Sequence, residues 1–210
     1  MNLPLDTDKL PNRPQRANGI ARYKVLVEAT EQLLNEEGPG GVTIKAIAEQ
    51  SGIPMASVYH FFPSPAAACV ALAEKHLDQL LNLALKSSTK KVSNEDSHQG
   101  IMRTTVSYYN RHPAARHLIL GSEYNSQIRH ADLAANTKIA LIIAETLPPL
   151  PEGRVELDIH LITKTAIRIS DAIWSLSVVE TGKITKAYAR EAERAVDAYL
   201  TAIFTDPSHT

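Results

Sequence analysis

The stretch TIKAIAEQSGIPMASVYHFFPS, residues 43–64, decides the fold. Thr43 is a good N-cap for a short helix over 44–50, and Pro54 suits the first turn of a second helix that ends near Phe61. Ser51 and Gly52 separate the two helices, because a glycine can adopt the positive φ that ends a helix sharply. Two short helices joined by so tight a turn are typical of a helix-turn-helix.

Small and apolar residues occupy the positions at which two crossing helices would touch. Ala48 is small where the backbones approach, and Ile47, Ile53, Val58 and Phe61 are spaced to fill the wedge between the helices. Val58 and Phe61 are therefore expected to point inward. Taken alone, an Ala-x-x-x-Gly-Ile fragment is more often a helical hairpin in a protein core than a DNA-binding unit. The residues on either side of the fragment are therefore needed to distinguish a core hairpin from a DNA-binding unit.

The rest of the chain is predicted to be helical as well. Apolar residues recur at three- and four-residue steps, and prolines and glycines end the runs. We expect helices over 19–37, 66–86, 101–111, from 113 onward, and over 126–147, 152–181 and 184–204, with a polar loop over 87–100. The sequence contains no alternating strand pattern and no internal repeat. The fold is therefore predicted to be all-α, with an N-terminal three-helix head and a C-terminal helical bundle.

The composition excludes several classes of protein. With 210 residues, 44% of them hydrophobic, the chain can bury a proper core. Its one cysteine, Cys69, cannot form an internal disulfide, which favours a reducing compartment. No apolar run reaches the roughly 18–20 residues that a membrane span needs, and no signal-peptide pattern is present, so we expect a cytoplasmic protein with no membrane partner. The net charge of −1 gives no general attraction to nucleic acid.

The first 18 residues differ from the remainder of the chain. They hold three prolines and show no helical periodicity, so we expect residues 1–18 to form a flexible arm. A basic cluster begins in this arm and continues into the first helix, with no acidic residue between 9 and 27; it comprises Lys9, Arg13, Arg16, Arg22 and Lys24. Such a cluster is usually a solvated tail, so on its own it only weakly indicates contact with nucleic acid.

Residues 43–53 together with SVYHFFPS, residues 57–64, resemble the DNA-binding head of the TetR family of transcriptional regulators. The resemblance is specific over residues 20–64. Over the rest of the chain it extends to architecture only: a loop after the fourth helix, a His112-Pro113 helix start and two long closing helices. It implies a helix-turn-helix DNA-binding domain over 19–64, after the arm over 1–18, and an effector-binding and dimerisation domain over 65–210.

The resemblance also implies which residues contact DNA. The second helix of the motif would lie in the major groove, with further contacts to phosphates around it; these residues are Thr43, Lys45, Met55, Ala56, Ser57, Tyr59, His60 and Ser64. The chain departs from the family pattern at Pro54-Met55 and Pro65-Ala66, where cationic residues are common. We expect Arg13, Arg16, Arg22 and Lys24 to compensate, with Arg13 or Arg16 entering a minor groove. For Tyr59 the alternative is a core aromatic.

Two copies of the head are expected to act together, because one recognition helix on one half-site binds weakly. The last two helices carry mixed small and large residues that suit close packing of four helices between two chains. The predicted homodimer interface consists of Ile169, Ile173, Trp174, Ser177, Tyr188, Ala192, Ala195 and Tyr199. The alternative is that these residues pack within one subunit, and Trp174 suits an interface and an interior equally well.

An effector pocket in a helical bundle needs apolar walls and a few convergent polar groups. The polar candidates are Tyr108, Tyr109, His117, Tyr124 and Arg168, and the wall candidates are Leu77, Leu81, Leu120, Ile143 and Thr165. For each of them, a place in the core or on the surface is an open alternative. A polar stripe in the helix expected over 152–181 is interpreted as a solvated face, with a pocket lining as the alternative; it consists of His160, Lys164, Arg168, Asp171 and Ser175. We expect no cofactor, and no metal site, since His112 and His117 are five residues apart and share no helix face.

The function predicted from these features is a ligand-responsive, DNA-binding transcriptional regulator. A repressor released from its double-stranded DNA operator by a small, largely apolar effector agrees best with the pattern. The alternative is a helical ligand-binding or interaction protein whose DNA-contacting head is weakened, as Met55 and Pro65 suggest. An enzyme is disfavoured, because Gly121-Ser122-Glu123 is no nucleophile elbow and Cys69 lies on an apolar helix face.

Overall fold

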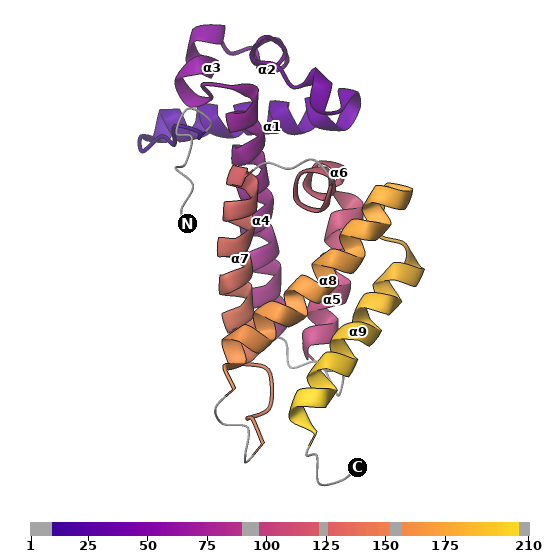
Figure 1. Cartoon of the computed structure of the whole chain (residues 1–210). Coiled ribbons are helices and arrows are strands. Elements are labelled where there is room, and N and C mark those ends of the chain that lie inside the picture. The colour runs from indigo at the N-terminus through magenta and orange to yellow at the C-terminus, as the bar shows by residue number, and fades with distance from the viewer. Residues whose placement is uncertain (1–9, 90–96, 122–125, 152–156, 206–210) are drawn as a thin grey trace.

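The computed structural model describes residues 10–89, 97–121, 126–151 and 157–205. Every regular element within these ranges is helical, which confirms the all-α prediction. The helices form a small head, laid across one end of a long bundle (Figure 1). One helix, α4, runs from the head down the length of the bundle and belongs to both (Figure 1).

The head consists of α1 (Ala17–Glu37), α2 (Ile44–Ser51) and α3 (Met55–Phe61), with a short 3-10 turn, Pro39–Gly41, after α1. The local chemistry of α2 is as predicted: the Ala46 N–H donates to Thr43 Oγ1 at 3.0 Å, and Gly52 ends the helix with a φ of 66°. Val58 and Phe61 point into the head core, where Leu26 and Ile47 are also buried. This packing fixes the orientation of α3 on the surface of the head.

The connecting helix α4 (Pro65–Thr89) begins where the Ala67 N–H donates to Ser64 Oγ at 3.2 Å. Its first turns contribute Ala67 and Leu72 to the head core, and its later turns contribute Leu77 and Leu80 to the bundle core. No single helix in the described ranges is long and apolar enough to cross a membrane, although α3 and α4, bent by 62°, pass that test of length and composition as a pair.

The bundle is completed by α5 (Ser97–Arg111), α6 (Pro113–Ala115), a π-helical turn η3 (Arg116–Leu120), α7 (Ser126–Ala144), α8 (Ile159–Thr181) and α9 (Lys186–Phe204). The helix α7 lies along α4, and α8 runs obliquely across the bundle and packs against α7 and α9 (Figure 1). The two closing helices are antiparallel and turn at Gly182, whose φ is 75°. This turn lies between the two closing helices that were expected over 152–181 and 184–204.

Several helix ends differ from the sequence-based expectation. The loop expected over 87–100 is shorter at both ends, because α4 continues to Thr89 and α5 begins at Ser97. The eighth helix begins at Ile159, where the His160 N–H donates to Asp158 Oδ1 at 2.8 Å, and the expected start at 152 lies outside the described residues. The ninth begins after Thr185, whose hydroxyl accepts from the Tyr188 N–H. These side-chain caps decide the ends more sharply than periodicity does.

Residues 10–16 are docked on the head and on α4, which corrects the expectation of a flexible arm for this segment. Leu10 packs beside Val70 and Ala73. The backbone N–H of Asn12 donates to the Phe61 carbonyl at 2.8 Å, and its side-chain amide donates to the His60 carbonyl at 2.8 Å. These two carbonyls belong to the last turn of α3 and have no hydrogen-bond partner within that helix. Asn12 supplies the missing donors, and these bonds hold the N-terminal segment on the head.

Candidate nucleic-acid interface and effector cavity

The helix α3 has one buried side and one exposed side. Val58 is 0% exposed, whereas Met55 is 49% and Tyr59 52% exposed. Ala56 and His60 are exposed as well, and Ser57 is half-buried. The five side chains that the sequence assigned to DNA therefore lie on the accessible part of one short helix. This helix stands at the surface of the head, as Figure 1 shows.

The flanking cationic residues are placed unevenly around α3. Arg16 and Arg22 are exposed, and Arg16 lines a cleft that residues 14–19 form with His60 and Phe61. Arg13 lies elsewhere: its guanidinium binds the carboxylate of Glu74 on α4. The structure therefore places Arg16 beside the exposed helix and pairs Arg13 with Glu74 of α4, and the entry of Arg13 or Arg16 into a minor groove stays a prediction.

The three remaining predicted contacts lie at the ends of the helices. Thr43 and Lys45 are exposed at the start of α2, and Lys45 Nζ is 3.8 Å from Glu49 Oε1. The hydroxyl oxygen of Thr43 is already used as a helix cap, and so is that of Ser64, which is half-buried before α4. Both hydroxyls can still donate a hydrogen bond to a phosphate while they cap a helix.

A cavity lies inside the bundle between α4, α5, α7, α8 and α9. Its walls are mainly apolar, with Leu80, Met102 and Ile143 among them, and Asn136 and Asp171 supply polar groups. The cavity volume is about 60 Å³. A site for a drug-sized ligand takes about 300 Å³ or more, so an effector of that size has to widen the cavity.

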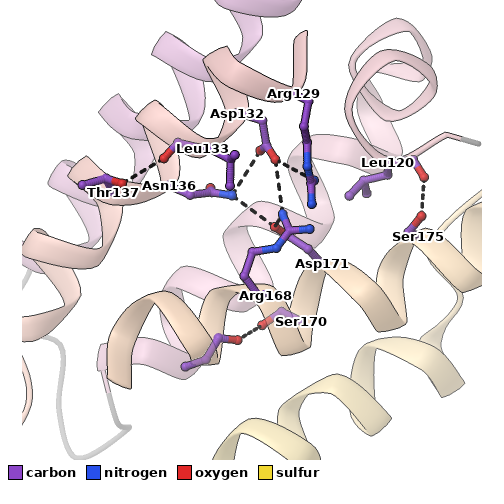
Figure 2. A network of polar contacts seen from close by, with 11 residues as sticks. Leu120, Arg129, Asp132, Leu133, Asn136, Thr137, Arg168, Ser170, Asp171 and Ser175 are labelled. Carbon is purple, nitrogen blue, oxygen red and sulfur yellow. Dashed lines mark hydrogen bonds and ion pairs between the residues drawn. The ribbon is translucent and has the colours of Figure 1, made fainter. Parts of the chain in front are cut away.

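A polar network closes one side of this cavity (Figure 2). Arg168 Nη1 donates to Asp132 Oδ2 at 3.2 Å and to Asp171 Oδ2 at 3.1 Å. The amide of Asn136 donates to Asp132 Oδ1 at 3.1 Å and to Asp171 Oδ2 at 3.2 Å, and Arg129 Nη1 adds a contact of 3.2 Å to Asp132. Burial, together with the nearby charge of Asp132, raises the pKa of Asp171 to about 7 in spite of Arg168.

Comparisons with known proteins agree with this geometry. A family model described as bacterial regulatory proteins, tetR family, matches residues 26–67, and a model of the tetracyclin repressor-like C-terminal domain matches residues 95–200. The chain belongs to the TetR family. No curated protein sequence matches it. As a TetR-family protein, it is a DNA-binding transcriptional regulator.

Solved structures share the fold of this TetR-family regulator at low sequence identity. A TetR-family regulator from Streptomyces coelicolor is 18% identical with a TM-score of 0.65, and covers 87% of this chain and 99% of its own. SmeT, the repressor of the Stenotrophomonas maltophilia multidrug efflux pump SmeDEF, is 18% identical with a TM-score of 0.62, covering 88% and 91%. The SmeT–triclosan complex is 19% identical with a TM-score of 0.58, covering 89% and 93%.

The structure separates the predicted effector residues into several groups. Only Tyr109 and Ile143 line the cavity. Leu77 and Leu81 line an open groove between α4 and α7 instead. The remaining candidates do not line the cavity: Tyr108 binds His76, His117 and Leu120 lie on η3, Thr165 donates to the Leu161 carbonyl, Arg168 belongs to the polar network, and Tyr124 lies outside the described residues.

Trp174 and Asp171 line the cavity of this TetR-family regulator. The sequence analysis placed Trp174 at an interface or in the interior, and gave a pocket lining only as the alternative for the stripe that contains Asp171. The ring of Trp174 is buried inside the subunit, 6.4 Å from the ring of Tyr109, so of its two predicted places the interior is the one observed. Its buried Nε1–H has no hydrogen-bond partner. An unpaired buried donor of this kind costs about 1–3 kcal/mol.

The predicted dimer interface is also divided by the structure. Trp174, Ser177 and Ala192 are buried within the subunit, which leaves them no surface for a second chain. Ile169, Ile173, Tyr188, Ala195 and Tyr199 are half-buried. A row of large exposed apolar side chains, which the sequence did not single out, follows one side of α8: Leu161, Leu176 and Val179. The ends of this row are 18 residues apart, which is five helical turns.

Proposed function

We propose that this regulator is a repressor that a small, largely apolar effector releases from its operator. The observation that carries the proposal is the position of α4. Its first turns pack in the head core beneath α3, and its later turns supply Leu80 and Ala84 to the wall of the cavity. A ligand that widens the cavity therefore acts on the helix that supports the DNA-contacting head.

The coupling between effector binding and DNA binding can be described as a shift between two arrangements of the protein. An effector lowers DNA affinity only by the difference between its affinities for the two arrangements of the protein, and such differences are typically about 1–3 kcal/mol. The narrow cavity supports a large difference between these two affinities, because an effector can enter only the arrangement in which the wall residues have moved apart. SmeT, which shares this fold, is a repressor and has been solved with triclosan, and this supports both the repressor role and the small-molecule effector.

The chemistry of the cavity narrows the class of effector. Its apolar wall favours an apolar body, and the unpaired Trp174 Nε1–H favours a hydrogen-bond acceptor at one position. Asp171 is the only carboxyl group among the described wall residues, so an anionic group placed beside it would be repelled once Asp171 ionises. We infer that the effector is an uncharged apolar molecule with one acceptor such as a carbonyl, ether or hydroxyl oxygen.

The proposal includes a homodimer on a two-fold symmetric operator. Half-sites one DNA turn apart, about 34 Å, need two copies of α3. The exposed row of Leu161, Leu176 and Val179 supports the use of α8 as the contact between subunits, since exposed apolar side chains that share one side of a helix mark interaction surfaces.

The test is operator binding by the purified protein, measured by gel shift and fluorescence anisotropy with the promoter region upstream of its own gene. We expect a salt-sensitive specific complex that dissociates when an apolar effector is added. The variant Ala166→Leu fills part of the cavity and should bind the same DNA without responding to the effector. The absence of any salt-sensitive specific complex would instead favour a ligand-binding protein with a weakened head.

A further inference from the structure

Three potential metal ligands meet where the head, the connecting helix and the bundle join. Glu31 comes from α1, His76 from α4 and His112 from the junction of α5 and α6. One ligand atom of each lies within 4.8 Å of the others. His76 Nε2 is 3.3 Å from Glu31 Oε1, and His112 Nδ1 is 4.0 Å from the same oxygen. Three separate elements therefore present a carboxylate and two imidazoles to one point.

The hydrogen bonds of His76 determine which of its nitrogens is free. Tyr108 Oη donates to Gln79 Oε1, so its oxygen accepts from His76 Nδ1, 2.6 Å away. The proton of the neutral imidazole is thereby placed on Nδ1, and Nε2 carries a lone pair. A histidine that donates one ring N–H to a fixed acceptor is typical of metal ligands, because the bond sets both the tautomer and the ring orientation.

The free nitrogen of His76 is buried and has no hydrogen-bond partner. The residue is 0% exposed, and Nε2 makes no hydrogen bond, although Glu31 Oε1 lies nearby. A neutral imidazole nitrogen and a carboxylate oxygen that face each other both offer lone pairs, which repel unless a positive charge lies between them. The buried pair is therefore incomplete as it stands.

We propose that Glu31, His76 and His112 bind a divalent transition metal ion, with Zn²⁺ as the best fit. Bonds of about 2.0–2.2 Å at tetrahedral angles place two zinc ligands about 3.4 Å apart. The 3.3 Å between His76 Nε2 and Glu31 Oε1 matches this spacing. The contact from His112, at 4.0 Å, has to shorten by a few tenths of an ångström, which a rotation of this partly exposed ring can provide. Two imidazoles and one carboxylate are ligands that suit zinc.

The charges around the site suit a cation in part and oppose it in part. The carboxylate of Glu31 offers a negatively charged oxygen ligand to a cation. Lys75 opposes a dication, since its Nζ binds Glu31 Oε2 at 2.6 Å. This contact leaves Oε1 as the metal-binding oxygen.

The proposed metal site is open to solvent at His112. The side chain of His112 is 36% exposed, which gives the ion an entry path and leaves the fourth ligand position to water. A bound ion would join the head to the bundle through three elements. Its effect on DNA affinity rests on the proposed function, whereas binding of the ion does not. Sequence spacing cannot indicate such a site, because its ligands are separated by 45 and 36 residues.

The test is metal binding by the full chain, purified without a histidine tag and treated with a chelator. Co²⁺ is the spectroscopic probe, and Zn²⁺ is then added as a competitor. We expect one Co²⁺ per chain with the intense visible absorption of a tetrahedral ion, displaced by one equivalent of Zn²⁺. Glu31→Gln and His112→Ala should lower the affinity at least about 100-fold, and the positioning variant Tyr108→Phe about tenfold. Lys75→Met should raise it.

The control variant is His160→Ala, which removes an exposed histidine on α8 and should bind Co²⁺ as the wild type does. Circular dichroism checks that each variant is folded, and the His112 variant keeps the test valid if changes at buried His76 prevent folding. Binding that is unchanged in both Glu31→Gln and His112→Ala would overturn the proposal, and so would the absence of a stoichiometric complex.

Discussion

The guanidinium of Arg13 and the carboxylate of Glu74 form an ion pair that ties the N-terminal segment to α4. Arg16, three residues further on, is exposed in the cleft beside His60. Two arginines of the same basic cluster therefore differ in their contacts. Arg13 pairs with a carboxylate of the protein itself, and Arg16 is exposed on the surface that carries α3. Their removal should have different consequences.

Arg16→Ala is expected to weaken operator binding and to lower the slope of log affinity against log salt by about one, because one phosphate contact is lost. Arg13→Ala is the matched control. It should leave this slope unchanged and lower the free energy of unfolding slightly, by about 1 kcal/mol or less, as for an exposed ion pair. Anisotropy titrations at four or five salt concentrations measure both slopes. Equal slopes for the wild type and Arg16→Ala would contradict the assignment.

Tyr59→Ala should reduce operator affinity while the protein stays folded, since Tyr59 is 52% exposed and its neighbour Val58 carries the packing. The loss should amount to about 1 kcal/mol, roughly the net value of one hydrogen bond. Val58→Ala should do the reverse, lowering the free energy of unfolding by about 1–2 kcal/mol through a cavity in the head core. Gel shift and urea denaturation of both variants test this difference.

The head could be predicted from sequence because its rules are local. Thr43 caps the helix that follows it, Gly52 ends that helix with a positive φ, and Val58 and Phe61 fill the wedge at helical spacing. Each of these features depends on residues a few positions apart. The resemblance to a known family added the function of the exposed side of α3, which packing rules alone do not provide.

The cavity could not be predicted in the same way, because its residues meet only through the packing of the bundle. Asp171 belongs to a stripe that was interpreted as solvated, since the periodicity of α8 does not reveal that Asp132 and Asn136 of α7 cover it. The arm was expected to be flexible for a similar reason: the partner of Arg13 is 61 residues away. Sequence patterns give the side of a helix, and the fold decides what covers it.

The fluorescence of Trp174, the single tryptophan of the chain, should report effector binding directly. Trp174 lines the cavity, so an effector that reaches its Nε1–H should change the emission intensity or wavelength. Leu80→Phe, which narrows the same cavity, should weaken this response about tenfold or more, because overpacking leaves less space for the ligand. Leu81→Phe is the control, since Leu81 lines the outer groove. An equal effect of both changes would argue against a ligand in the cavity.

Leu176→Asp is expected to convert a homodimer into monomers. Leu176 is 50% exposed on α8, and a carboxylate at the centre of an apolar contact would be left unpaired and desolvated. Leu85→Asp, at a leucine on α4 that is 44% exposed, is the matched control and should leave the assembly intact. Light scattering coupled to size exclusion gives the mass of each variant. A wild type that is monomeric at the concentrations used for operator binding would remove the basis of this prediction.

Asp171 should make the protein less stable as the pH rises. Its pKa is about 7 in the folded protein against an ordinary value of 3.8, so the folded state holds a proton that the unfolded state has released. Between these two values the free energy of unfolding therefore falls with increasing pH, and above about 7 the loss is complete. Asp171→Asn removes this titration, while Arg168 keeps its contact with Asp132.

The variant Asp171→Asn should accordingly differ little from the wild type near pH 4 and be more stable by about 1–3 kcal/mol at pH 8. Urea denaturation at intervals between these pH values measures the difference, with an unchanged m-value as evidence that the unfolding reaction is the same. A difference that does not vary with pH would mean that Arg168 and Asn136 hold this carboxylate ionised throughout. The polar network at the cavity would then be a fixed ion pair, and a cationic group on the effector would become the better match.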